Sequence, residues 1–209
     1  MGLRHWVVLL LTAGLFGSSF FFIKLTIGDI PPLTLAAGRT IVAAVIIYLF
    51  MRWKGYRLPP WGREWWVLCI LGLLLSAMPY AAIAWGQAHI ESSLAGILFT
   101  VIPVFTVLIG PFFLEEEYLS VQRVIGVVVG FSGVVLAIGP AALGGIGTQL
   151  LGAAATLFAA LCYATGGMYT RLNQHIPPLT LAAGQMIIGA VILTGFSVAV
   201  DAPWSLRPD

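Results

Sequence analysis

The sequence has few charged residues. Only 9% of its 209 residues are Asp, Glu, Lys or Arg, whereas 60% are hydrophobic. A soluble domain carries about 25% charged residues, because water must solvate its surface. Ten basic and eight acidic side chains cannot cover a globule of this length, and a net charge of +2 provides no electrostatic footprint for nucleic acid. The composition therefore excludes a soluble enzyme, a nucleic-acid-binding protein and a disordered chain. It predicts a multi-pass protein embedded in a lipid bilayer.

Cysteine and metal-ligating residues are also scarce. Cys69 and Cys162 both lie inside apolar runs, which excludes a disulfide scaffold. The three histidines, His5, His89 and His175, fall at the ends of apolar segments or in loops. No nucleophile–base pair or ligand cluster can be recognised, so we predict that the chain is not an enzyme and uses neither a metal nor a cofactor.

Seven apolar segments are each long enough to form a membrane-spanning helix, which needs about 20 residues. None alternates with the period of two that a barrel strand requires. The predicted spans are Trp6–Ile23, Leu33–Met51, Trp65–Gln87, Ser92–Leu114, Val121–Gly139, Leu150–Tyr169 and Leu179–Val200. The loop from Arg52 to Arg63 contains four basic residues, and positively charged loops face the cytoplasm. We therefore expect a cell (cytoplasmic, inner) membrane protein with a cytoplasmic N-terminus.

One segment of the sequence is repeated. Residues 30–50 read IPPLTLAAGRTIVAAVIIYLF and residues 176–196 read IPPLTLAAGQMIIGAVILTGF, so 14 of 21 positions match at an offset of 146 residues. The second and seventh spans are then equivalent, and the repeat unit has five spans. Because five is odd, the second copy enters the membrane in the opposite direction. Inverted repeats of this kind are typical of secondary transporters.

The repeat predicts an all-α fold with the first seven helices of a ten-helix, 5+5 architecture. Residues 1–140 would form a complete five-helix repeat, and residues 149–209 would form the first two helices of a second, incomplete one. We therefore expect the sequence to be a C-terminally truncated portion of a ten-helix protein, or else a natural short product.

Several ordered motifs resemble one transporter family. GLFGSSFFFIKL at residues 14–25, the LAAGR segment that ends at Arg39, IPVF at residues 102–105 and the spaced glycines after Gln122 follow one another in the order seen in the EamA-like family of the drug/metabolite transporter superfamily. Thr40 departs from this resemblance, because the family commonly has an aromatic residue there. The resemblance implies ten helices and alternating-access transport of small metabolites or drug-like solutes. It does not indicate the substrate, the direction of transport, a coupling ion or the oligomeric state.

Polar groups within the apolar segments are the candidates for a substrate path. Charges inside a membrane are costly and are usually functional, although a lysine near a helix end can also reach the interface. Small polar residues can equally hold helices together. The substrate-path candidates are Ser18, Lys24, Arg39, Ser76, Tyr80, Gln87, Thr100, Pro103 and Tyr163. Among them, we expect Ser76, Tyr80, Gln87 and Tyr163 to face one another.

Two further observations separate the competing functions. No Asp or Glu lies in the middle of a predicted span, so this part of the protein offers no carboxylate proton relay. A seven-helix receptor would have no five-span inverted repeat, and truncation of a ten-helix protein accounts for the count of seven spans. A transporter is therefore the preferred function, with a non-transporting fragment as the alternative and a receptor as the weaker one.

Overall fold

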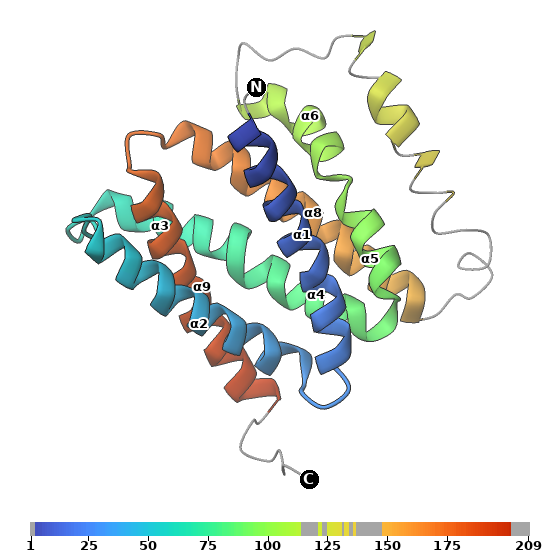
Figure 1. Cartoon of the computed structure of the whole chain (residues 1–209), viewed down its shortest axis with the longest axis horizontal. Coiled ribbons are helices and arrows are strands. Elements are labelled where there is room, and N and C mark those ends of the chain that lie inside the picture. Colours follow the sequence, from blue (N-terminus) through green and yellow to red (C-terminus); the bar gives the residue numbers. More distant parts are fainter. Residues whose placement is uncertain are drawn as a thin grey trace.

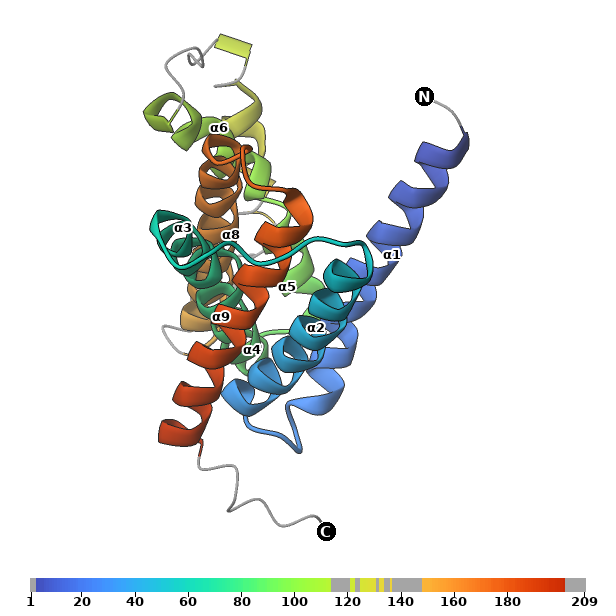
Figure 2. The same ribbon diagram turned by 90° about the vertical axis from the view of Figure 1, so that its left-hand side faces the viewer.

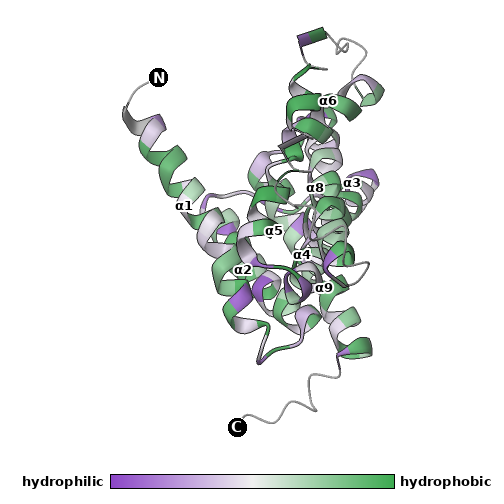
Figure 3. Ribbon diagram, turned by 90° about the vertical axis from the view of Figure 1, so that its right-hand side faces the viewer, coloured by the Kyte–Doolittle hydropathy of each residue, from purple (hydrophilic) through white to green (hydrophobic). Residues whose placement is uncertain are grey.

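The computed structural model describes residues 3–113, 121–122, 125–130, 132–133, 136 and 148–201. Within these ranges all the regular structure is helical, and six helical segments are long and apolar enough to cross a membrane. They are His5–Thr26, Pro32–Trp53, Arg63–His89, Ser92–Phe113, Gln149–Leu172 and Pro178–Val200. The chain is thus a helical integral membrane protein, and apolar residues dominate its helices along their lengths (Figure 3). The remaining predicted span, Val121–Gly139, lies partly outside the described residues.

The six segments are divided into nine helical elements (Figure 1). In chain order they are α1 (Leu3–Thr26), α2 (Pro32–Trp53), α3 (Arg63–Gly72), the π-helix η1 (Leu73–Ala77), α4 (Met78–His89), α5 (Ser92–Phe99), α6 (Ile102–Phe113), α8 (Thr148–Leu172) and α9 (Pro178–Val200).

The two copies of the repeated sequence form α2 and α9, which lie side by side and run in opposite directions (Figure 2). Both helices begin at the second proline of their Pro-Pro pair, at Pro32 and Pro178. Proline suits the first helical position because its missing N–H would have no partner there. The shared sequence therefore sets the same start in both copies, and the chain places those starts at opposite ends of the pair.

The third span contains a local change of helix type before Pro79. Proline cannot donate the N–H that would bond to the carbonyl four residues earlier. The chain forms η1 at Leu73–Ala77, and the N–H of Met78 donates to the carbonyl of Leu73, five residues back. The widened turn accommodates the proline and lets the span continue through α4 without a break.

The fourth span divides into α5 and α6 at Thr100 and Val101. Here the N–H of Thr100 donates to Ile97 and the N–H of Val101 donates to Leu98, both with the tighter three-residue spacing. Pro103 follows within the first turn of α6, where its missing N–H is tolerated. The predicted continuous helix is therefore two helices joined by a tight turn.

Helices α4 and α8 approach each other closely through glycine. A Cβ atom added to Gly86 would lie 2.8 Å from the carbonyl oxygen of Gly152 and 2.8 Å from Oγ1 of Thr156. Small residues of this kind allow membrane helices to pack closely. By contrast, α1 contacts α4 and α5 mainly through its second half, where Ile23 is buried. Only 6% of the most apolar stretch of this span is buried.

Candidate functional site

A small cavity lies where α1, α2, α4, α5 and α8 meet. Its volume is about 50 Å³. The lining combines a guanidinium, a hydroxyl and two phenols with aromatic and aliphatic side chains. These lining residues are Phe16, Ser19, Phe20, Ile23, Arg39, Tyr80, Ile83, Phe99 and Tyr163.

Arg39 is the charged residue of this cavity. It lies about two turns inside α2 and is partly buried. Its Nη2 donates to Oγ of Ser19 at 3.0 Å, and its guanidinium carbon lies 5.4 Å from the centre of the Tyr80 ring. Arginine stacks favourably on an aromatic face. These contacts hold the guanidinium against the wall of the cavity.

Tyr80 and Tyr163 bring two phenols from different helices to the same cavity. Tyr80 belongs to α4 and Tyr163 to α8. The ring of Phe99 lies edge-on to Tyr163 at 5.2 Å and edge-on to Phe20 at 5.4 Å. This chain of rings fixes the phenol of Tyr163 beside the cavity.

Lys24 and Gln87 lie near the C-terminal ends of α1 and α4, respectively. The Lys24 ammonium donates to the backbone carbonyls of Gln87 at 3.0 Å and Ile90 at 2.9 Å, so it binds the C-terminal end of α4. A cation is favourable at that end of a helix dipole. The side-chain amide of Gln87 is fully buried, and neither its nitrogen nor its oxygen has a hydrogen-bond partner. Such a buried, unpaired amide is unusual and costly.

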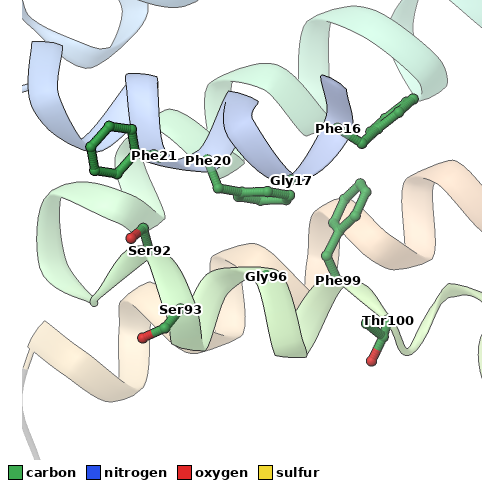
Figure 4. A pocket seen from close by; sticks show the side chains of 9 residues that line it. All are labelled: Phe16, Gly17, Phe20, Phe21, Ser92, Ser93, Gly96, Phe99 and Thr100. Atoms are coloured by element: carbon green, nitrogen blue, oxygen red, sulfur yellow. The ribbon is translucent and has the colours of Figure 1, made fainter. Parts of the chain in front are cut away.

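A wider groove of about 450 Å³ runs between α1 and α5 and borders the small cavity (Figure 4). Phe16, Phe20 and Phe99 line both spaces. Figure 4 shows the rings of Phe16 and Phe99 close together between the two helices, whereas the Thr100 side chain points away from α1. Because the three rings belong to both linings, the polar cavity and the apolar groove adjoin each other.

The structure distributes the predicted path residues over several places. Arg39, Tyr80 and Tyr163 line the small cavity. Lys24 and Gln87 do not line it and lie together near the C-terminal ends of α1 and α4. Ser76 is buried against α9, where its hydroxyl lies 3.7 Å from Sδ of Met186, so it does not join Tyr80 and Tyr163 there.

The other predicted residues lie outside the cavity. Ser18 donates to the carbonyl of Leu15 in its own helix, and Thr100 donates to Ile97 in the same way. Pro103 is exposed on α6. Ser19, the neighbour of Ser18, holds Arg39 instead. Ser19 and Ile23 are four residues apart, and residues at this spacing share a helix face. This spacing could have indicated that Ser19, rather than Ser18, lines the cavity with Ile23.

Known proteins of similar sequence are named as transporters. An uncharacterized transporter of Archaeoglobus fulgidus is 28% identical over 93% of this chain and 67% of its own length. The uncharacterized transporter YoaV of Bacillus subtilis is 26% identical over 90% of this chain and 64% of its own length. The uncharacterized inner membrane transporter YedA of Escherichia coli is 23% identical over 88% of this chain and 59% of its own length. The chain therefore spans about two thirds of the length of these curated relatives.

The fold and a family match agree with these relatives. A solved crystal structure aligns with a TM-score of 0.59 at 22% identity, over 90% of this chain and 68% of the other. At that identity the likeness concerns the fold alone. Residues 4–139, more than half of the sequence, match the EamA-like transporter family. The chain belongs to the EamA-like transporter family and is a transporter-type membrane protein rather than an enzyme.

Proposed function

We propose that this chain forms the larger part of a carrier that moves a small solute by alternating access, with the solute bound near Arg39, Tyr80 and Tyr163. The observation that carries the proposal is the antiparallel pair of α2 and α9, two copies of one sequence that run in opposite directions. Carriers with inverted repeats bind their substrates at the repeat interface and expose them to each side in turn.

Contacts at the two ends of the pair support this symmetry. At the start of α2, Thr34 contacts Ser197 and Asp201 at the end of α9. At the start of α9, the equivalent residue Thr180 lies with its hydroxyl 3.4 Å from the carbonyl of Arg57, beyond the end of α2. The same position of the repeat thus meets the end of the opposite copy on both sides of the pair.

We further propose a ten-helix carrier in which residues 1–140 form the first five-helix repeat and residues 149–209 begin the second. The greater length of the relatives supports this architecture. Uptake of a panel of organic acids, amino acids and amines into liposomes would compare the 209-residue chain with a version extended by three further helices. We expect uptake only by the extended version, and equal uptake by both would contradict the ten-helix proposal.

Alternating access can be tested directly at Ser19. In a variant whose two native cysteines are replaced by serine, Ser19→Cys should react with a membrane-impermeant thiol reagent from either side of the membrane. Leu11→Cys on the exposed part of α1 is a matched control that should react from neither side. Reaction of Ser19→Cys from one side alone would contradict alternating access through this cavity.

We propose an inner-membrane location, which the name of the relative YedA supports because it calls that protein an inner membrane transporter. The N-terminus is proposed to lie in the cytoplasm because the loop after α2 is rich in basic residues. The loop after α2 would then be cytoplasmic, and the turn after α1 would face the other side. In the same cysteine-free variant, Asp29→Cys should be labelled from outside intact cells, whereas Tyr56→Cys should be labelled after the cells are opened. The opposite pattern would reverse the orientation.

A further inference from the structure

The guanidinium of Arg39 has no acidic partner among the residues that the structure describes. One of its five N–H groups donates to Ser19, and its face contacts Tyr80, but neither neighbour carries a negative charge. In the described part of the chain the acidic residues are Asp29, Glu64, Glu91 and Asp201, and none of them lines the cavity. A charge within a membrane span is costly unless it is compensated. Among the described residues the charge of Arg39 is therefore uncompensated, and an anion bound in the cavity would compensate it.

The size of the cavity limits what that anion can be. A volume of about 50 Å³ approaches that of two water molecules, because each water occupies about 30 Å³ in the liquid. A carboxylate is flat and small, and it matches the two parallel N–H donors of a guanidinium. The phenols of Tyr80 and Tyr163 line the same cavity, and because they hydrogen-bond to each other, one hydroxyl proton remains to be donated to the anion.

The adjoining groove indicates the rest of the molecule. Its volume of about 450 Å³ is that of a small-ligand site, and phenylalanine rings dominate its lining (Figure 4). Because Phe16, Phe20 and Phe99 line both spaces, one molecule can place a charged end beside Arg39 and an apolar body between α1 and α5.

We propose that the solute is an organic carboxylate with an apolar body, whose carboxylate pairs with Arg39 and whose body lies against Phe16 in the groove. This inference rests on the proposed function, because it assigns a substrate class to the same site. An organic cation would meet the like charge of Arg39, and a neutral amide would leave that charge uncompensated.

Binding of three molecules with the same apolar body can test the proposal. The probes are 3-phenylpropionate, its neutral amide 3-phenylpropanamide and the cationic 3-phenylpropylamine, titrated by calorimetry into the purified chain in detergent, with empty micelles as the blank. We expect the carboxylate to bind at least tenfold more tightly than the amide, which corresponds to about 1.4 kcal/mol. Equal binding of the three probes, stronger binding of the amine, or binding of none would overturn the proposal.

Two pairs of variants locate the binding. Arg39→Gln should remove the preference for the carboxylate, and glutamine is the residue at the equivalent position of the second copy, Gln185. Arg63→Gln, at an exposed arginine on α3, should retain the preference. Phe16→Ala should weaken binding of the carboxylate, whereas Phe22→Ala, an exposed ring of α1 outside both spaces, should not. A preference that survives Arg39→Gln would contradict the assignment.

The binding assay is independent of transport. If the carboxylate binds through Arg39 but Ser19→Cys is accessible from one side alone, the alternating-access proposal fails and the ligand class stands. If Ser19→Cys is accessible from both sides and the probes bind equally, the ligand class fails and the carrier proposal stands.

Discussion

Thr34 and Asp201 join the start of one repeat copy to the end of the other. The backbone N–H and the hydroxyl of Thr34 both donate to Oδ2 of Asp201, at 2.7 and 2.9 Å, and the same hydroxyl lies 2.9 Å from Oγ of Ser197. No side chain of α2 itself caps this helix, whose preceding residue is Pro31. A carboxylate from the end of α9 therefore satisfies a free N–H at the positive end of the α2 dipole.

Removing the negative charge of Asp201 should weaken this connection. We expect Asp201→Asn to lower the free energy of unfolding by about 1 kcal/mol, which is below the usual range for a hydrogen bond to a charged group because Asp201 is partly exposed. Thermal unfolding in detergent would measure the change. Asp29→Asn is the matched control, because Asp29 is exposed in the turn after α1. An equal effect of both substitutions would show that the contact with Thr34 contributes nothing specific.

The close approach of α4 and α8 should not tolerate a methyl group. We expect Gly86→Ala to destabilise the chain by about 1–3 kcal/mol, the usual cost of overpacking, because its Cβ would meet the backbone of Gly152. Gly167→Ala, on α8, has nothing within 4 Å of its added Cβ. There the helix propensity of alanine should leave stability unchanged or slightly higher. Unfolding curves that rank the two variants the other way would contradict the close contact between α4 and α8.

Lys24 should stabilise the junction between α4 and α5. Its ammonium donates to two carbonyls at this junction, and we expect Lys24→Met to lower stability by about 1–2 kcal/mol. Amide hydrogen exchange should accelerate in residues 88–92, because the end of α4 loses its cation. Lys54→Met is the control, since the Lys54 ammonium lies over the exposed ring of Trp53, at 4.9 Å, outside the helix bundle. An unchanged rate of amide exchange in Lys24→Met would mean that Lys24 serves to reach the membrane–water interface and does not stabilise this junction.

The positions of the helices follow from composition, whereas the faces that they present to one another do not. Uninterrupted apolar runs predict seven spans, and the structure places six of them, all those that lie wholly within the described residues or end one residue beyond them, within a few residues of the expected bounds. In lipid, however, both the buried and the outer faces of a helix are apolar, so hydrophobic periodicity does not mark the interior. This explains why helical spacing groups Ser76 with Tyr80, although the structure places Ser76 against α9.

The details of the site depend on contacts that are remote in sequence. The selection of Ser19 rather than Ser18 results from the position of Arg39, 20 residues later, and the burial of Gln87 results from packing among several helices. Arg39 and Tyr163 could be proposed from sequence because a charge and a phenol inside apolar helices stand out. That both residues line the same cavity could not be predicted, because it depends on how α2 and α8 pack around α1 and α4.

The unpaired amide of Gln87 provides the last prediction. A buried amide without a partner costs about 1–3 kcal/mol, and an apolar side chain of similar shape removes that cost. We therefore expect Gln87→Met to raise the melting temperature, whereas Gln149→Met, at an exposed glutamine at the start of α8, should leave it unchanged. If the amide is retained because it contacts the solute, Gln87→Met should also weaken binding of 3-phenylpropionate. A lower melting temperature with Gln87→Met would mean that the amide has a stabilising partner in the folded protein, and the buried polar group would then have a structural role rather than a role in the solute path.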